Sequence, residues 1–326
     1  MSSARNHAFV FAVLALVAAG CSNAAGGNAG ASETPLVSVP PVAATPAPVV
    51  AAPSAFNETR AFADLEKQVA FGPRYSGSPG YPKMRDWLVK TLAETSGVAA
   101  KRHDFTATVR GERLPMSNVY AHINPDAKTQ VLLCAHYDTR PTADEEIDEA
   151  KQKLPIPGAN DGASGVAVLL ELARVLKDKP PTCGVQIVFF DGEDYGPGEE
   201  DMYLGAREWA KAFPLSKPTY AILIDMIGDK SLQIHREQAS QSNAPEINDK
   251  VWAAASTLGV RGFEDSVKYS ISDDHIPLQA AGVKAIDLID FDYGAWHTLD
   301  DTPAQCSPAS LGTVGAVLAK VIYDEK

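Results

Sequence analysis

Apolar, β-rich runs that alternate with amphipathic segments constrain the fold of this chain more than any other feature. The run Val185–Phe190 is almost wholly apolar. It indicates an interior strand, because a strand with one face in water would alternate apolar and polar residues. The segment Ala163–Lys177 before it has the spacing of a helix that packs along one face. Such alternation builds a sheet covered by helices on both faces, so the sequence predicts an α/β fold.

The same patterns predict the individual elements. We expect strands at Asn118–Ile123, Val131–Ala135, Val185–Phe190, Tyr220–Asp225 and Lys284–Ile289. We expect helices at Thr59–Phe71, Pro82–Thr95, Ala163–Lys177, Leu204–Ala212, Glu246–Leu258 and Pro308–Tyr323. The pair Pro180-Pro181 then turns the chain out of the third helix before the next strand begins.

The start of the chain predicts export. Arg5 precedes an apolar stretch, Ala8–Ala19, which is too short to span a membrane, as in a signal peptide over residues 1–20. The run Val17–Cys21 resembles a bacterial lipobox, in which the Cys becomes the lipidated first residue of the mature chain. The alternative is a plain signal peptide cleaved near Ala24. We expect an exported bacterial lipoprotein, anchored to the membrane by its lipid alone, that faces the periplasm or the cell exterior.

Composition sets the domain boundaries. Residues 21–55 are mostly Ala, Pro, Gly, Ser and Val, which predicts a lipidated flexible tether. No second linker and no internal repeat interrupts residues 56–326, which are expected to form a single domain. With 326 residues, of which 45% are hydrophobic, the chain has enough apolar material for one large core.

Charge and cysteine content narrow the choice of function. A formal net charge of -12 argues against a nucleic-acid-binding protein, which needs clustered Lys and Arg to displace counterions from phosphates. The cysteines after Cys21 are Cys134, Cys183 and Cys306. An odd number permits at most one disulfide within the chain, and the sequence does not choose the pair.

Acidic residues and histidines gather where the predicted strands end. The polar residues that end or follow strands are His136, Asp138, Glu193, Asp194, Asp225 and His297, and Asp161 precedes a predicted helix. Ligands of open α/β sheets collect beyond the carboxyl ends of the strands, so these side chains are expected to converge on one edge.

Each of these residues has a simpler explanation when taken singly. A lone His after a strand is more often a hydrogen-bonded structural residue, and Asp161 could cap its helix. Together, however, the carboxylates would repel one another unless a cation or protons compensate. His and carboxylate ligands without a thiolate suit zinc in an open catalytic site better than they suit calcium. The sequence therefore predicts a zinc enzyme.

An ordered set of motifs resembles the zinc aminopeptidase and glutaminyl cyclase superfamily, with the look of bacterial members of the cyclase branch. The motifs are His136-Tyr137-Asp138, Gly158–Gly165, Phe190–Asp194, Asp225–Gly228 and Trp296-His297-Thr298. The resemblance runs from about residue 60 to the C-terminus. It implies a three-layer sandwich with a mixed, mostly parallel sheet, which agrees with the fold predicted above. It also makes residues 56–326 a zinc-dependent catalytic domain that acts on peptide or protein N-termini.

The resemblance implies roles for individual residues. The implied ligands of the principal zinc are Asp161, Asp194 and His297, and those that complete a second site around Asp161 in the aminopeptidases are His136 and Asp225. Asp138 would orient His136, and Glu193 would be the general acid and base. Many members have Glu-Glu where this chain has Glu193-Asp194. The shorter Asp reaches the metal only if its backbone lies slightly closer.

Two branches of this superfamily perform different reactions. An aminopeptidase uses zinc and the Glu to activate a water that attacks the first peptide bond. A glutaminyl cyclase uses one zinc to polarise the side-chain amide of an N-terminal Gln, while the Glu moves a proton from the α-amine to departing ammonia. Cyclisation needs no water, so it benefits from an apolar cover over the site.

Several residues favour the cyclase branch. Trp296 and the segment Ser272–Pro277 resemble the cyclases, where Asp273 would join Glu193 and Asp225 in an acidic relay. The residues expected to wall the substrate pocket are Phe291, Tyr293 and Trp296. Two features count against this reading. The second-site ligands His136 and Asp225 are both present, although they also persist in one-zinc cyclases. Residues 196–201 lack the Trp that animal cyclases have there. We expect a glutaminyl-peptide cyclotransferase, with a di-zinc aminopeptidase as the alternative.

Two other classes fit less well. A non-catalytic binding protein on this fold would be expected to lose Glu193 or a zinc ligand, and the chain keeps them all. A serine hydrolase of the α/β type would need a Gly-x-Ser-x-Gly turn, and the sequence contains none.

Replacing Cys21 with Ala is expected to release the protein from the membrane, because the lipid on this residue would be its anchor. Membrane fractionation and mass spectrometry of the mature N-terminus, both in the native host, measure the effect. The wild-type chain should begin at a lipidated Cys21. A full-length chain that retains an unmodified Cys21 would contradict the hypothesis.

Overall fold

The computed structural model describes residues 56–326. The predicted signal peptide, the tether and Cys21 lie outside the described residues, so their outcome stays a prediction. Within residues 56–326, none of the helices combines the length and the apolar character that crossing a membrane requires.

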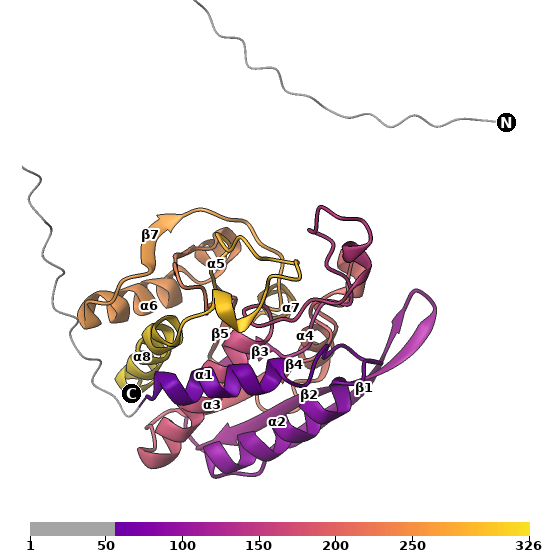
Figure 1. Cartoon of the computed structure of the whole chain (residues 1–326). Helices are drawn as coiled ribbons and strands as arrows, with labels where there is room; N and C mark the ends of the chain where they lie inside the picture. Colours follow the sequence, from indigo (N-terminus) through magenta and orange to yellow (C-terminus); the bar gives the residue numbers. More distant parts are fainter. Residues whose placement is uncertain (1–55) are drawn as a thin grey trace, which may run out of the picture. The chain divides into compact units, whose positions relative to one another are not determined.

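A six-stranded sheet forms the centre of the fold, with the strand order β1-β2-β4-β3-β5-β8. Its strands are β1 (Lys101–Val109), β2 (Glu112–Ile123), β3 (Gln130–His136), β4 (Gly184–Phe190), β5 (Tyr220–Asp225) and β8 (Ala285–Ile289). β4, β3, β5 and β8 run parallel, and β2 and β1 join antiparallel beside β4. Figure 1 shows β3, β4 and β5 at the centre of the sheet. The sheet is mixed and mostly parallel, as predicted, and four strand ends meet at one edge.

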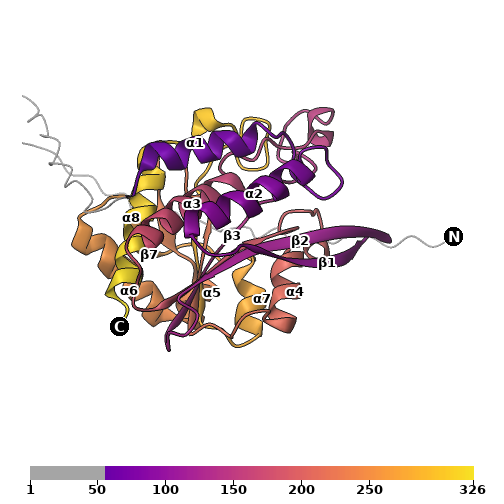
Figure 2. The same cartoon turned by 90° about the horizontal axis from the view of Figure 1, so that it is seen from below.

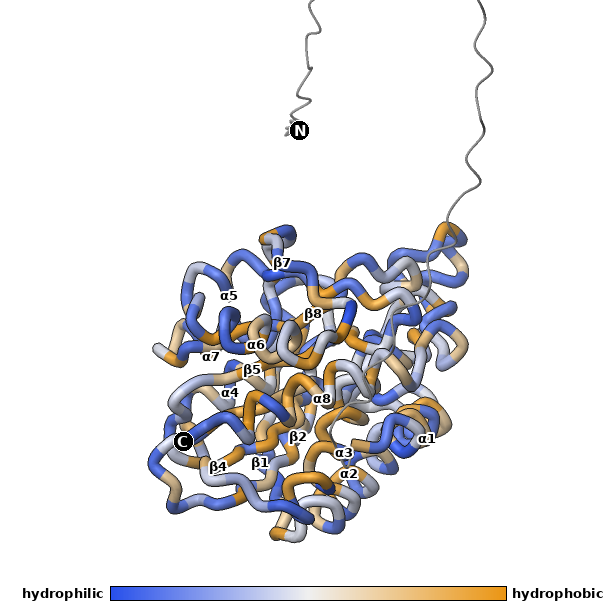
Figure 3. Tube along the Cα trace, turned by 90° about the vertical axis from the view of Figure 1, so that its left-hand side faces the viewer, coloured by the Kyte–Doolittle hydropathy of each residue, from blue (hydrophilic) through white to orange (hydrophobic). Residues whose placement is uncertain are grey.

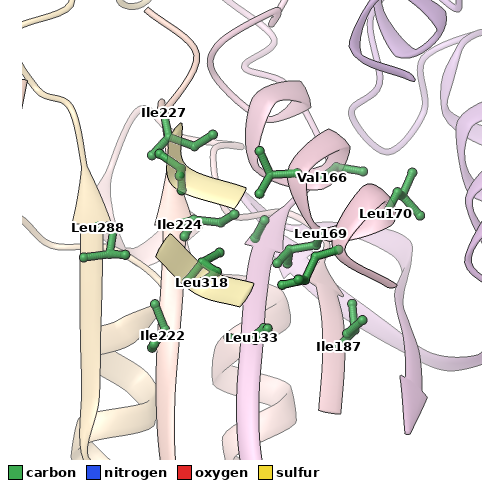
Figure 4. Packing of buried hydrophobic residues seen from close by; sticks show 14 of the residues in the cluster. Leu133, Val166, Leu169, Leu170, Ile187, Ile222, Ile224, Ile227, Leu288 and Leu318 are labelled. Carbon is green, nitrogen blue, oxygen red and sulfur yellow. The ribbon is translucent and has the colours of Figure 1, made fainter. Parts of the chain in front are cut away.

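The apolar runs exist because these strands are buried on both faces. In β3, Val131, Leu133 and Ala135 belong to one hydrophobic cluster, while Leu132 and Cys134 belong to the other. Successive side chains of a strand point to opposite faces, so a strand between two cores needs apolar residues at every position. We call the cluster that contains Val131, Leu133 and Ala135 the first core, and the other cluster the second core. Figure 4 shows the first core, where Leu133, Ile187 and Ile222 of the sheet face α3 (Ala163–Asp178) and Leu318.

Helices cover both faces of the sheet, which confirms the predicted three-layer α/β sandwich. The first core is closed by α1 (Glu58–Val69), α2 (Tyr81–Ser96), α3 (Ala163–Asp178), α6 (Pro245–Leu258) and α8 (Pro308–Asp324). The second is closed by α4 (Leu204–Ala212) and α7 (His275–Ala280). Figure 2 shows α1, α2 and α3 on one side of the strands and α4 and α7 on the other. In Figure 3 the hydrophobic colour follows the strands together with α3 and α8.

The sequence did not predict every element. The elements it missed are β1, the parallel pair β6 (Ile234–Arg236) and β7 (Phe263–Val267), and the six-residue helices α5 (Gln238–Asn243) and α7. The three described cysteines, whose pairing the sequence left open, are all buried and free.

Replacing Gly165 with Ala should lower the free energy of unfolding by about 1–3 kcal/mol, the usual cost of overpacking a core. A Cβ on this α3 residue would lie 2.5 Å from the carbonyl oxygen of Ile224 and 2.8 Å from Cβ of Ala135, so the helix must move off the sheet. Urea denaturation measures the change. Gly294→Ala is the control, because a Cβ there meets no atom within 4 Å. Equal stability of the two variants would show that α3 does not need this close approach.

Candidate metal centre

Two groups of buried side chains at the carboxyl edge of the parallel strands could hold a metal ion. One contains Asp161, Asp194 and His297, and the other contains His136, Asp161 and Asp225. Within each group the ligand atoms lie within 4.8 Å of one another, and Asp161 belongs to both. The structure therefore brings together all five residues that the sequence singled out as metal ligands. We call the first group the principal cluster and the second group the second cluster.

The distances within both clusters suit tetrahedral zinc. Zinc binds His nitrogen and carboxylate oxygen at roughly 2.0–2.2 Å, so two ligand atoms of one tetrahedron lie roughly 3.3–3.6 Å apart. In the principal cluster, Nε2 of His297 lies 3.5 Å from Oδ2 of Asp161 and 3.4 Å from Oδ2 of Asp194. In the second cluster, Nε2 of His136 lies 3.3 Å from Oδ1 of Asp161 and 3.1 Å from Oδ1 of Asp225. Three of these four distances lie within the expected range and the 3.1 Å distance is slightly shorter, so both clusters suit zinc, and the fit does not determine the number of ions.

The electrostatics of this edge favour positive charge. Burial lowers the pKa of His297, but Asp194, Asp144 and Asp161 outweigh it and raise the pKa to about 10. Burial also lowers the pKa of His136, and the neighbouring carboxylates, Asp225 foremost, hold it well above its ordinary value. An environment that attracts protons to imidazoles attracts a divalent cation for the same reason.

Asp301 holds the loop that carries Asp161 by accepting its backbone N–H groups. Oδ1 and Oδ2 of the fully buried Asp301 accept hydrogen bonds from the N–H groups of Asn160 (2.8 Å) and Asp161 (3.2 Å). Burial is the main cause that raises the pKa of Asp301 to about 7. Gly162 follows with a φ of 94°, and a Cβ there would collide with the carbonyl oxygen of Asp138. The chain therefore turns into α3 directly after the ligand only because residue 162 is Gly.

Asp138 holds the two residues that follow β4. Its carboxylate accepts the backbone N–H groups of Glu193 (3.1 Å) and Asp194 (3.2 Å). The same carboxylate lies 3.6 Å from Nδ1 of His136, the nitrogen that points away from the second cluster. Asp138 therefore lies where the sequence placed it, next to His136, and in addition it fixes the backbone of the general-base candidate and of one ligand.

A small cavity of about 60 Å³ opens beside the clusters. Room for one water takes roughly 10–15 Å³, so this space suits a few atoms, as in a short amide side chain. Its acidic lining is Asp161, Glu193, Asp194, Asp225 and Asp273, and its apolar lining is Met202, Met226, Ile271, Ile289, Phe291 and Trp296. The ring of Trp296 stacks on His297 at 3.9 Å and meets Phe291 at 5.0 Å.

Glu193 and Asp273 are carboxyl groups that can hold a proton in this cavity. Burial, together with the charges of Asp273 and Asp194, raises the pKa of Glu193 well above its ordinary range, although His136 opposes the shift. Burial and the charge of Asp225 likewise raise the pKa of Asp273. Carboxyl groups with raised pKa values beside an apolar wall are suited to general acid and base chemistry.

Two observations differ from what the sequence predicted for the residues that line the substrate pocket. Phe291 and Trp296 line the cavity, but Tyr293 does not: it is buried, and its hydroxyl donates a 2.7 Å hydrogen bond to Asp301. Tyr293 thus supports the Asp161 loop through Asp301. The residues that the sequence did not single out are Asp301, Arg140, Asp144 and the apolar liners Met202, Met226, Ile271 and Ile289. For two of them a signal existed: Asp301 follows Trp296-His297-Thr298 closely, and Met226 lies within the Asp225–Gly228 motif.

Comparisons with known proteins agree with this geometry. Residues 118–322 match the model of peptidase family M28. A glutaminyl-peptide cyclotransferase-like protein of Bos taurus is 27% identical over 281 residues, which cover 76% of this chain and 70% of the relative. The glutaminyl cyclase of Tannerella forsythia superposes with a TM-score of 0.80 at 37% identity, covering 83% of this chain and 99% of the other. A Zn-dependent exopeptidase of Parabacteroides distasonis superposes with a TM-score of 0.81 at 34% identity, covering 84% and 100%.

Variants of the clusters should separate ligands from the general base. Asp161→Asn removes a carboxylate shared by both clusters and His297→Ala removes the imidazole of the principal cluster, so both purified variants should lose zinc. Glu193→Gln should retain zinc, because Glu193 belongs to neither cluster. Elemental analysis of the purified proteins measures the metal content. A zinc-free Glu193→Gln protein would show that ligand and base are misassigned.

Proposed function

This chain belongs to peptidase family M28, and we propose that it is a zinc-dependent glutaminyl-peptide cyclotransferase, which converts an N-terminal Gln to pyroglutamate and releases ammonia. The observation that carries the proposal is the cavity itself. It is lined both by carboxyl groups with raised pKa values and by apolar side chains, beside a cluster that fits zinc. Similarity to bacterial glutaminyl cyclases over more than four fifths of the chain supports it.

Asp161, Asp194 and His297 would hold the zinc, which when bound supplies a Lewis acid for the side-chain amide of the substrate. In the reaction the α-amine nitrogen bonds to the amide carbon, and the bond from that carbon to the amide nitrogen breaks. Glu193 accepts the proton that the α-amine loses and returns it to the departing nitrogen, which leaves as ammonia. Asp273 and Asp225 line the same cavity, where they can share that proton with Glu193.

The apolar wall gives the site its preference for cyclisation. Trp296 and Phe291 cover one side of the cavity, and Met202 and Ile289 add further apolar surface. The cavity is small, about 60 Å³, so a Gln side chain folded into it would displace water from beside the reacting carbon. Excluding water favours attack by the substrate's own amine over hydrolysis.

A di-zinc aminopeptidase is the second candidate, and the second cluster favours it. His136, Asp161 and Asp225 have distances of 3.1 Å and 3.3 Å, close to those that tetrahedral zinc requires. The similarity to a Zn-dependent exopeptidase is also as extensive as that to the cyclases. In this function the residues of the two clusters would hold two zinc ions, which would supply Lewis acidity for hydrolysis of the first peptide bond, with Glu193 as the general base.

Outside the described residues, the proposal extends to an exported lipoprotein that residues 21–55 tether to a membrane. The predicted signal peptide and lipobox are its support. A tether of this kind would leave the catalytic domain free to reach the N-termini of extracytoplasmic peptides.

Two peptides that differ only in an N-terminal Gln or Leu should separate the two functions. Mass spectrometry should show loss of ammonia from the Gln peptide with every peptide bond intact, and no change in the Leu peptide. Glu193→Gln should reduce turnover at least about a hundredfold, because a general acid and base is removed. Release of free Leu, together with two zinc ions per chain, would overturn the cyclase proposal in favour of the aminopeptidase.

A further inference from the structure

Arg140 bridges two carboxylates next to the principal cluster. It lies four residues after His136 in the sequence, and its side chain is only 5% exposed. Nη1 donates a 2.5 Å hydrogen bond to Oδ1 of the ligand Asp194. Nε and Nη2 donate to Oδ1 and Oδ2 of Asp144, at 2.7 Å and 2.8 Å. The guanidinium thus uses both of its edges, a geometry that the single ammonium of Lys does not reproduce.

Together with two contacts of His297, these hydrogen bonds form a closed ring of four side chains: Arg140, Asp144, His297 and Asp194. Oδ1 of Asp144 lies 3.4 Å from Nδ1 of His297, on the side of the imidazole that faces away from the cluster. Nε2 of the same imidazole lies 3.4 Å from Oδ2 of Asp194. Arg140 therefore restrains Asp194 directly. It also holds Asp144 within ion-pair distance of Nδ1 of His297, an atom that makes no hydrogen bond within residues 56–326. A partner on the outer nitrogen of a ligating His fixes its tautomer and its ring orientation.

The two carboxylate oxygens of Asp194 have different surroundings. Arg140 occupies Oδ1, whereas Oδ2 is buried and has no hydrogen-bond partner within residues 56–326. Asp194 is thus oriented to offer one defined oxygen to a metal.

The neighbouring loop is shaped to admit the guanidinium. A Cβ on Gly196 would lie 2.5 Å from Nη1 of Arg140, and the φ of Gly196 is 46°. A side chain at position 196 would require the guanidinium to move from its present position. The bridge therefore involves three segments of the chain: the one after β3, the one after β4 and the one that carries His297.

We propose that Arg140 is a positioning residue of the metal site, which holds Asp194 directly and His297 through Asp144 in the arrangement that binds zinc. The inference rests on the proposed role of the principal cluster as a zinc site. It concerns metal affinity and is independent of whether the bound zinc serves cyclisation or hydrolysis.

The test is the zinc dissociation constant of the purified protein, measured by competition with a chelating dye. Arg140→Met should weaken zinc binding about 10- to 100-fold, the usual effect of removing a partner of a metal ligand. Arg140→Lys should recover part of the loss, because Lys keeps the charge but only one of the contacts. Asp144→Asn should weaken zinc binding several-fold, since the charge beside His297 is lost.

Arg236→Met is the matched control. Arg236 is also a buried arginine between two carboxylates, Asp265 at 2.6 Å and Asp249 at 2.7 Å, and it belongs to neither metal cluster. Its loss should leave zinc affinity within about twofold of wild type. If Arg140→Met fails to fold, Arg140→Lys and Asp144→Asn carry the test.

Wild-type zinc affinity in the Arg140 and Asp144 variants would overturn the inference. Equal weakening in the Arg236 variant would do the same, because it would show a general effect on the fold. Absence of zinc binding by the wild-type protein would remove the premise and the inference together. Tight zinc binding without pyroglutamate formation would contradict only the proposed function.

Discussion

Mutual repulsion among buried carboxylates is the constraint on which the rest of this structure depends. The ends of parallel strands and the loop before α3 bring Asp161, Asp194, Asp225 and Glu193 to one edge, where burial withholds the water that would screen them. Fixed hydrogen-bond donors compensate part of this negative charge and that of the neighbouring carboxylates Asp138 and Asp301. Asp138 and Asp301 accept backbone N–H groups, which set the loops, and Arg140 neutralises Asp194. The fully buried Arg74 donates to the carbonyls of Tyr137, Pro157 and Gly158, although burial lowers its pKa to about 10. The negative charge that remains favours the binding of a divalent cation.

The sequence predicted the parts of the fold that have strong local patterns. β3, β4 and β5 are apolar at nearly every position because both faces are buried, and α3 carries a long periodic stretch. β1 escaped prediction because it lies at the edge of the sheet and its residues are mostly exposed or half-buried. The six-residue helices α5 and α7 are too short to show a helical period. The metal ligands were predictable because they follow strands in recognisable motifs. Arg140 was not, since its partner Asp194 lies 54 residues away and only the folded chain joins them.

The two candidate functions share their metal ligands, so the lining of the cavity distinguishes them. Glu193 would serve as a proton carrier in either reaction. What differs is the nucleophile, which is the substrate's own amine in cyclisation and a water in hydrolysis. In the proposed cyclase, Trp296 and Phe291, which line the cavity, would favour the amine by excluding water. Tyr293, predicted for the same wall, instead stabilises the loop of Asp161 through Asp301. In this proposal, the selectivity of the site would depend on the apolar side chains that line its cavity.

The central claim is that Asp161, Asp194 and His297 hold a zinc ion, and anomalous X-ray scattering at the zinc edge tests it most directly. A crystal of the purified protein should show a strong anomalous peak roughly 2.0–2.2 Å from a ligand atom of each of the three residues. A peak bound only by His136 and Asp225, or no peak between the three residues in zinc-supplemented crystals, would contradict the claim.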